Sequence, residues 1–269
     1  MSNSASTNNQ LPIGVFDSGI GGLTVFSAIR KLLPQESLVY LGDTARVPYG
    51  AKSPSTIKRY AFQSVEFLLK HNIKVAVVAC NTATAFAMDD LQRELEIPVI
   101  GVIEPGVRQA LIKTKGKLGV IGTRGTIASE AYPRLIAQLQ ARVEVFAEAC
   151  PLFVSLVEEG WQQQDAARLV VKTYLVPLKT KVDTLILGCT HYPLLSKLIQ
   201  QEMGDKVSLI DSALATASSL QALLIKNNLC ADGVGSSEFF VTDLSGRFKE
   251  IAQQFLGVDL PQINLAKLG

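Results

Sequence analysis

The chain has 269 residues, of which 48% are hydrophobic and 19% are charged, and its formal net charge is +2. This length allows one large domain or two small ones, each with its own core, and the composition is typical of a globular protein. A net charge this small, without a cluster of Lys and Arg that forms a stripe, argues against nucleic acid as a partner.

No apolar run approaches the roughly 18 residues that a membrane helix needs, so we expect no membrane association. The polar segment Met1–Gln10 lacks the basic and apolar regions of a secretion signal, and we expect a disordered tail on a cytoplasmic protein. The four cysteines, Cys80, Cys150, Cys189 and Cys230, include no C-x-x-C pair, which predicts free thiols rather than disulfides.

Short apolar segments alternate with amphipathic ones along the first part of the chain, which predicts parallel strands joined by helices. We expect strands at Ile13–Phe16, at Leu38–Leu41, at the apolar start of Lys74–Thr84, and at Pro98–Ile103 before Glu104-Pro105-Gly106. We expect helices at Leu23–Leu33, at Ser55–His71 and from the first cysteine loop through Leu95.

The pattern of strands then restarts. Expected strands follow at Leu118–Ile121, at Val143–Phe146, at the apolar start of Lys181–Pro193 and at Val207–Ile210. Cys189 lies 109 residues after Cys80, and the other elements return at nearly the same offset. Four strands that return in order predict an α/β fold of two similar parallel-sheet lobes, with the active site in the cleft between them.

We expect residues 11–105 with 212–269 to form the first lobe and residues 106–211 the second, after a tail at residues 1–10. The last segment holds a helix at Leu214–Lys226, a short apolar stretch at Glu238–Thr242 and a helix at Gly246–Leu256. Because it contains no third copy of the repeat, we expect this segment to pack on the first lobe.

In each lobe one buried strand ends at a cysteine followed by small polar residues, in Cys80-Asn81-Thr82 and in Cys189-Thr190-His191. The carboxyl ends of parallel strands form the ligand crevice of an open α/β sheet. Amides at the start of a following helix favour an anion, so we expect the thiolates to form easily. If the lobes face each other through equivalent edges, both cysteines open onto one cleft.

Two thiols on opposite sides of a cleft suit the inversion of a carbon centre by proton transfer. One thiolate takes a proton from one face, the other thiol gives a proton to the opposite face, and the two then exchange states. The reference pKa of cysteine, about 8.5, lies near the range in which general acid–base groups work best. Asp17 can orient Cys80 or take its proton, while His191 and either Glu158 or Glu159 can support Cys189.

Each of these residues also has a simpler interpretation. A lone buried cysteine is commonly a small hydrophobic residue, as we expect of Cys150 and Cys230. Zinc-ligand spacing is absent, so we expect no metal. The turn Gly19–Gly22 fails the dinucleotide pattern G-x-G-x-x-G because its last glycine position is Thr24. Four other polar residues could simply cap helices: Asn81, Thr82, Thr123 and Thr190.

Five motifs of the chain resemble those of the glutamate racemases, within the cofactor-independent aspartate/glutamate racemase superfamily. They lie at Gly14–Thr24, Asp43–Gly50, Ala79–Thr84, Ala149–Gly160 and Gly188–Pro193. The similarity runs from about Pro12 to Leu256. Several independent motifs in the right order make this resemblance specific.

The resemblance implies that Cys80 and Cys189 are the paired acid/base residues, on opposite faces of the α-carbon of glutamate. It implies that Asp17 supports Cys80 and that Glu158 and His191 support Cys189. The implied substrate contacts are Asp17, Ser18, Tyr49, Gly50, Asn81, Thr82, Thr123, Thr190 and His191. It further implies that the enzyme needs no cofactor and that its D-glutamate serves peptidoglycan synthesis. The sequence leaves the oligomeric state open, with a homodimer as one option.

Three other functions compete with this one. An aspartate racemase, or another racemase of the superfamily, would share both thiols. A non-catalytic protein that binds an amino acid could have the same two-lobed cleft, although binding alone does not require two thiols and two supporting acids. A racemase dependent on pyridoxal phosphate would need a Schiff-base lysine, and Lys74 and Lys181 lie at the wrong ends of their strands.

Overall fold

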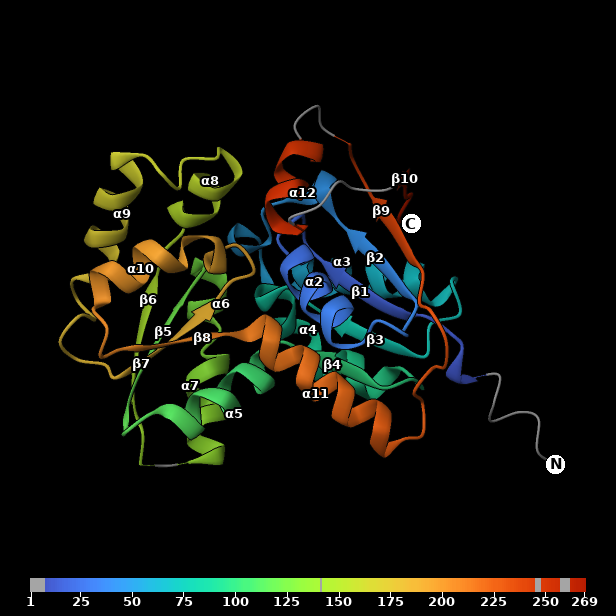
Figure 1. Ribbon diagram of the computed structural model, residues 1–269, viewed down its shortest axis with the longest axis horizontal. Helices are drawn as coiled ribbons and strands as arrows, with labels where there is room; N and C mark the ends of the chain where they lie inside the picture. The colour runs from blue at the N-terminus through green and yellow to red at the C-terminus, as the bar shows by residue number, and fades with distance from the viewer. Residues whose placement is uncertain (1–7, 141, 245–247, 257–261) are drawn as a thin grey trace.

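The computed structural model describes residues 8–140, 142–244, 248–256 and 262–269, which form two α/β lobes side by side (Figure 1). Lobe one contains a parallel sheet with the strand order β10-β9-β2-β1-β3-β4. Its strands are β1 (Ile13–Asp17), β2 (Leu38–Gly42), β3 (Val75–Val78), β4 (Val99–Gly101), β9 (Ser237–Val241) and β10 (Ile263–Leu265).

Lobe two contains a second parallel sheet with the order β6-β5-β7-β8, which repeats the order β2-β1-β3-β4 of lobe one. Its strands are β5 (Lys117–Gly122), β6 (Glu144–Ala149), β7 (Thr184–Gly188) and β8 (Ser208–Asp211). The predicted fold class, two similar parallel-sheet lobes, is therefore confirmed. The residue bounds given above for the tail and for each lobe stay a prediction.

Helices and short 3₁₀ helices connect the strands and cover both sheets (Figure 1). Around the first sheet lie α2 (Leu23–Leu32), η1 (Thr44–Arg46), η2 (Tyr49–Ala51), α3 (Pro54–Leu69), α4 (Asn81–Glu94), α11 (Ser212–Lys226) and α12 (Phe248–Leu256). Around the second lie α5 (Ile103–Lys113), α6 (Arg124–Ala128), α7 (Ala131–Leu139), α8 (Leu152–Glu158), α9 (Asp165–Leu175), η3 (Tyr192–Leu195) and α10 (Ser196–Met203).

Local sequence explains where these elements begin. Helix α3 starts at Pro54, which needs no backbone donor there, and Ser53 before it accepts a hydrogen bond from the Thr56 N–H. Every residue of β1, β2, β3 and β7 is buried, as expected of parallel strands covered on both faces. The apolar runs in the sequence are thus the centres of the two sheets.

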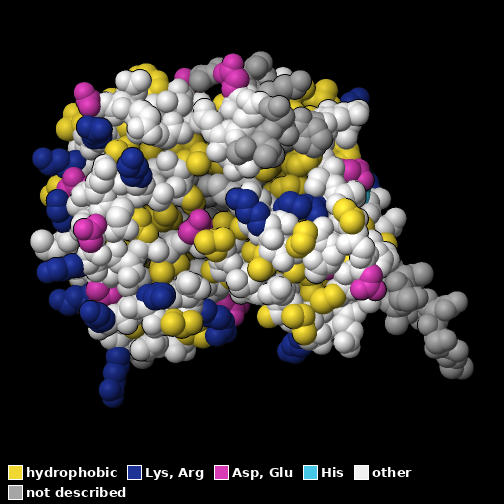
Figure 2. All heavy atoms as spheres, viewed as in Figure 1, with side chains coloured by type: hydrophobic (Ala, Val, Ile, Leu, Met, Phe, Trp, Pro, Cys, Tyr) yellow, Lys and Arg dark blue, Asp and Glu magenta, His cyan; other side chains and the backbone are white. Residues whose placement is uncertain are grey.

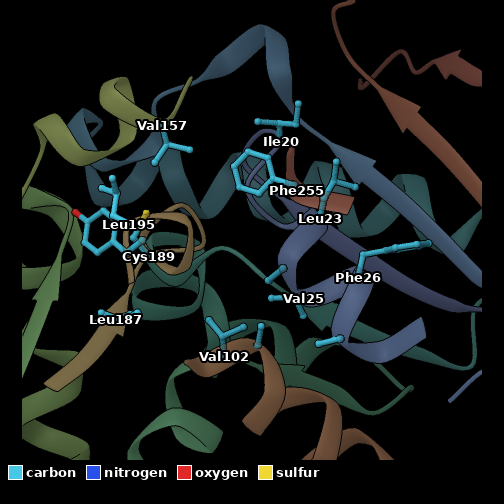
Figure 3. Packing of buried hydrophobic residues seen from close by; sticks show 14 of the residues in the cluster. Ile20, Leu23, Val25, Phe26, Val102, Val157, Leu187, Cys189, Leu195 and Phe255 are labelled. Carbon is cyan, nitrogen blue, oxygen red and sulfur yellow. The ribbon is translucent and has the colours of Figure 1, made fainter. Parts of the chain in front are cut away.

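One cluster of buried hydrophobic residues joins the two lobes. Figure 3 shows Val157, Leu187, Cys189 and Leu195 of lobe two near Ile20, Leu23 and Phe255 of lobe one. Burial of apolar surface in this cluster stabilises each lobe and also the packing of one lobe on the other.

The chain crosses between the lobes twice, and at the first crossing the predicted end of a strand is wrong. The strand expected at Pro98–Ile103 ends earlier, at Gly101, because α5 begins at Ile103 and takes Glu104-Pro105-Gly106 into its first turn. A proline is tolerated in that turn because the first amides of a helix have no partner within it. The second crossing runs from β8 into α11. The two meet where a Cβ on Gly106 would lie 2.7 Å from the Ser212 Oγ.

The end of the chain returns to lobe one. Strand β9 pairs with β2, with Leu38 opposite Ser237, and α11 packs along α2. Strand β10 was not predicted. The expected helix Gly246–Leu256 is described from Phe248 onward, and its first two residues lie outside the described part of the chain, as do residues 1–7 of the expected tail.

Within the described ranges, no helix is long and apolar enough to cross a membrane. Many Lys and Arg side chains gather over the helices of lobe two at the left of the view, with Asp and Glu side chains among them (Figure 2). This mixture of signs agrees with the small net charge of the sequence.

Candidate active site

A cavity of about 320 Å³ lies between the lobes and contains both candidate cysteines. Its lining includes every predicted site residue except Asp17, namely Ser18, Tyr49, Gly50, Cys80, Asn81, Thr82, Thr123, Glu158, Cys189, Thr190 and His191. A larger groove of about 730 Å³ runs along α4, α5, α7 and α11, but none of these residues lines it. We therefore take the smaller cavity as the candidate active site.

Cys80 occupies the position directly before α4, where its Sγ accepts a hydrogen bond from the Ala83 N–H at 3.4 Å. The Cys80 residue is 6% exposed. Burial, followed by the negative charge of Asp17, raises the pKa of Cys80 to about 12. The expectation that this thiolate forms easily is therefore wrong, since the helix amide does not compensate for the lost solvation.

Asp17 is the last residue of β1 and lies beside the start of the Cys80 loop, because β1 and β3 pair in parallel. Its Oδ2 accepts a hydrogen bond from the Gly19 N–H at 2.9 Å, and within the described residues its buried Oδ1 has no partner. Burial raises the pKa of Asp17, partly offset by the charge of His191 and by nearby amides. Asp17 does not line the cavity, so its direct substrate contact stays a prediction.

A chain of three side chains forms the opposite wall. Cys189 follows β7, and its Sγ lies 3.9 Å from the His191 Nδ1. The Nε2 of His191 lies 3.1 Å from the Glu158 Oε1. This contact identifies Glu158, rather than Glu159, as the carboxylate on His191. Glu158 is the last residue of α8, and 37% of its side chain is exposed.

His191 is positioned to carry a positive charge at neutral pH. Burial lowers the pKa of the imidazole, but hydrogen bonds to Cys189 and Glu158 and the charges of both residues outweigh it and raise this pKa to about 10. A protonated His191 can donate a hydrogen bond to the Cys189 sulfur and attract negative charge as it develops there.

Hydrogen bonds across the lobe boundary hold the cavity walls together. The Tyr132 hydroxyl of α7 donates to the Asn81 Oδ1 at 2.6 Å, and the Thr82 Oγ1 lies 2.9 Å from the Thr123 Oγ1. The Thr24 hydroxyl lies 3.3 Å from the Thr190 carbonyl oxygen, which accepts. Residues of each lobe that line the cavity are thus held in place by hydrogen bonds from the other lobe.

The simpler interpretation of four polar residues as helix caps holds for one of them. Thr123 caps α6, where its Oγ1 accepts a hydrogen bond from the Thr126 N–H at 3.2 Å. It is wrong for Asn81 and Thr82, because Cys80 takes the cap position and they form the first turn of α4. It is also wrong for Thr190, since η3 begins only after His191.

Tyr49 and Gly50 reach the cavity from η2. The Tyr49 hydroxyl and the Arg46 guanidinium both donate to the Asp43 Oδ2, which fixes this segment on lobe one. Burial and the Asp43 carboxylate raise the pKa of Tyr49, so its hydroxyl stays protonated. A Cβ on Gly50 would lie 2.6 Å from the Thr123 Cβ, so only glycine allows the two lobes to approach here.

Sequence reasoning missed several lining residues: Gly19, Val47, Pro48, Ala51, Arg124, Pro151, Val154 and Ser155. Most of them belong to the motifs Asp43–Gly50 and Ala149–Gly160, so extending the prediction to whole motifs would have found them. Arg124 lies outside every motif and carried no such signal.

All four cysteines are free. In the part of the chain that the structure describes, no group of three His, Cys, Asp or Glu side chains is arranged to hold a metal ion.

Comparison with known proteins gives a consistent result. The model of the Asp/Glu/hydantoin racemase family matches residues 13–220. The chain is 50% identical over 255 residues to a glutamate racemase of Geobacter metallireducens, a match that covers 93% of this chain and 94% of that protein. It is 48% identical over 259 residues to a glutamate racemase of Chlorobaculum tepidum, which covers 94% of this chain and 95% of that protein.

Solved structures of glutamate racemases are also similar. The structure of an isoform from Bacillus anthracis gives a TM-score of 0.92 at 43% identity, over 97% of this chain and 98% of that one. The structure of the Francisella tularensis protein in complex with D-glutamate gives 0.91 at 39% identity, over 96% of this chain and 98% of that one.

Proposed function

The chain belongs to the Asp/Glu/hydantoin racemase family, and on this premise we propose that it interconverts L- and D-glutamate by two-base proton transfer between Cys80 and Cys189. The observation that carries the proposal is the equivalent placement of the two thiols. Each follows the third strand of its repeat, β3 or β7, and both line one cavity between the lobes.

The reaction exchanges one proton on each face of the α-carbon. A thiolate on one face takes the Cα proton, so that a C–H bond breaks and an S–H bond forms. A thiol on the opposite face gives its proton to the same carbon, so that an S–H bond breaks and a C–H bond forms. The two sulfurs end with exchanged protonation states, and neither an oxidant nor a cofactor is needed.

The groups beside the two thiols favour one starting arrangement. The raised pKa of Cys80 keeps it a thiol, which suits the proton donor. Cys189 lies beside the His191 imidazolium, which suits the sulfur that begins as a thiolate and becomes neutral as it takes the proton from carbon. The reverse reaction uses the same two residues in exchanged roles.

Glutamate as the substrate is supported by the relatives named above and by the polar groups in the cavity. The hydroxyls of Ser18, Thr82, Thr123 and Thr190 and the amide of Asn81 line it. Such donors suit the two carboxylates of the substrate. We further propose that the enzyme is cytoplasmic and that it supplies D-glutamate for peptidoglycan synthesis. A homodimer is part of the same proposal.

Circular dichroism of L-glutamate with the purified chain in D2O, without pyridoxal phosphate, metal or nucleotide, tests the proposal. The signal should decay to zero while deuterium enters at Cα, because the proton delivered comes from a solvent-exchanged thiol. The same assay with L-aspartate is the matched control. Decay with aspartate alone would change the substrate, and no decay with either would indicate a binding protein.

A further inference from the structure

Three threonine hydroxyls from the two lobes form a closed triangle beside the cavity. The Thr82 Oγ1 of α4 lies 2.9 Å from the Thr123 Oγ1 and 3.0 Å from the Thr126 Oγ1. The Thr123 and Thr126 oxygens are 3.0 Å apart. Thr82 and Thr123 line the cavity, whereas Thr126 is 1% exposed and does not.

The number of protons determines what this triangle can do. Each hydroxyl has one proton to donate and can accept through its oxygen. Three contacts and three protons match, so the triangle can hold every proton within itself. A carboxylate only accepts hydrogen bonds. For Thr82 and Thr123 to bind one, both protons must turn outward, and both oxygens then need donors from behind.

Thr126 provides both of these donors. Its backbone N–H already donates to the Thr123 Oγ1 at 3.2 Å. Its hydroxyl lies 3.0 Å from the Thr82 Oγ1, and within the described residues its recorded hydrogen bonds are those to Thr82 and Thr123 alone. Once Thr123 accepts from the amide, the Thr126 hydroxyl is left to donate to Thr82. One buried residue can thus direct two protons into the cavity.

We infer that Thr126 is a positioning residue that turns the hydroxyl protons of Thr82 and Thr123 toward a carboxylate of the substrate. This inference rests on the proposed function for the identity of the anion. It acts across the lobe boundary, since Thr126 belongs to lobe two and Thr82 to lobe one. Its effect therefore falls on substrate binding and leaves the thiol chemistry unchanged.

The test replaces Thr126 by valine, which has the same shape and keeps the backbone N–H but lacks the hydroxyl. We expect the KM for L-glutamate to rise about three- to tenfold, the effect of one net hydrogen bond, with kcat within about twofold. Thr126→Ser should restore the KM. Thr216→Val is the matched control, because Thr216 is equally buried and its hydroxyl donates to the Ser212 carbonyl, away from the cavity.

Calorimetric titration with D-glutamate, in chains that also carry Cys80→Ser to stop turnover, measures binding alone, so failure of racemisation in the unmutated chain would be seen separately from failure of the Thr126 role. In the Thr82→Val background, Thr126→Val should weaken binding little further, because the two act in one path. An unchanged KM and dissociation constant in Thr126→Val, or additive losses in the double variant, would overturn the inference. If Thr126→Val does not fold, Thr126→Cys, with its weaker donor, should give an intermediate KM, and a KM equal to that of the unmutated chain would count against the role.

Discussion

The two walls of the cavity are built on the same scaffold but provide their cysteines with different neighbours. In lobe one, Cys80 lies beside Asp17, a carboxyl group that is completely buried at the end of β1. The equivalent residue at the end of β5 in lobe two is Gly122, which has no side chain. Lobe two instead places His191 beside Cys189.

Because of this difference, the protons on the two thiols have different routes for exchange with water. His191 connects Cys189 to Glu158, whose side chain is 37% exposed, so a proton on the lobe-two wall can exchange with water through this chain. The described neighbours of Cys80 offer no exposed carboxylate in the same role, and burial keeps its proton on sulfur. The repeat therefore preserves the position of the thiols and changes the groups that surround them.

Removal of either thiol should have the largest effect on activity. Cys80→Ser and Cys189→Ser should each lower the rate of racemisation by at least about 10³-fold, because a hydroxyl is a far weaker acid than the thiol it replaces and almost none of it is ionised to act as the base. Circular dichroism with each enantiomer measures the rate. Cys150→Ala, at a buried cysteine outside the cavity, is the matched control and should stay within about threefold. A single serine variant that racemises at nearly the original rate would exclude the two-base mechanism.

Removal of the charge at Asp17 tests the lobe-one wall alone. We expect Asp17→Asn to lower kcat by about 10²-fold, at the lower end of acid–base effects. The carboxylate charge also raises the pKa of Cys80, so the variant should have a lower thiol pKa. Alkylation of Cys80 by iodoacetamide, followed by mass spectrometry across a pH series, should move to lower pH. An unchanged alkylation profile would contradict the electrostatic role of Asp17.

On the lobe-two wall, the charge of His191 should make the stability of the folded chain depend on pH. The pKa of His191 is about 10 in the folded chain against 6.5 as the reference value. A pKa raised by folding means that the protonated ring favours the folded state. This contribution is complete below about pH 6.5 and is lost as the pH rises to about 10.

The melting temperature of the unmutated chain should therefore exceed that of His191→Gln by an amount that shrinks between those pH values. Glu158→Gln should reduce the same difference, because it removes one of the partners that raise the pKa. A difference in melting temperature that does not vary with pH would show that the ring is not charged in the folded state.

The smallest expected effect concerns a contact that joins the two walls. Tyr132→Phe removes the hydroxyl that donates to the Asn81 Oδ1. Without this donor, the side-chain amide of Asn81 can exchange the positions of its oxygen and nitrogen. We expect the KM for glutamate to rise about two- to fivefold, with kcat nearly unchanged. Tyr192→Phe is a control in lobe two, since its hydroxyl donates to the Cys150 carbonyl outside the cavity. Equal effects of both variants would indicate general loosening of the lobe.

The sequence predicted the scaffold well because buried strands and their repeat leave a strong pattern. It placed Cys80 and Cys189 at the ends of their strands, and the structure brings both to one cavity. Residue type and spacing alone left Glu158 and Glu159 open, because that choice depends on which side of α8 faces His191, and it was the family resemblance that pointed to Glu158. Strand β10 was not predicted because it has three residues and, among the described strands, pairs with β9 alone.

Two properties of the site depend on distant contacts and so left no local signal. Burial reverses the expected effect of the helix amides on the Cys80 thiol, and burial is a property of the whole fold. Thr126 and Thr82 are 44 positions apart along the chain, and they lie side by side because the lobes meet there. Neither residue type nor spacing could have distinguished Thr126 from an ordinary helical threonine.

The matching order of strands in the two sheets has a consequence for how such a site can change. A symmetric pair of identical chains would necessarily present the same residue on both faces of a substrate, and any mutation would alter both at once. Covalent linkage of two copies in one chain removes that constraint. Asp17 and Gly122 could then differ at equivalent positions, and either face can be tuned by substitution while the other is left intact.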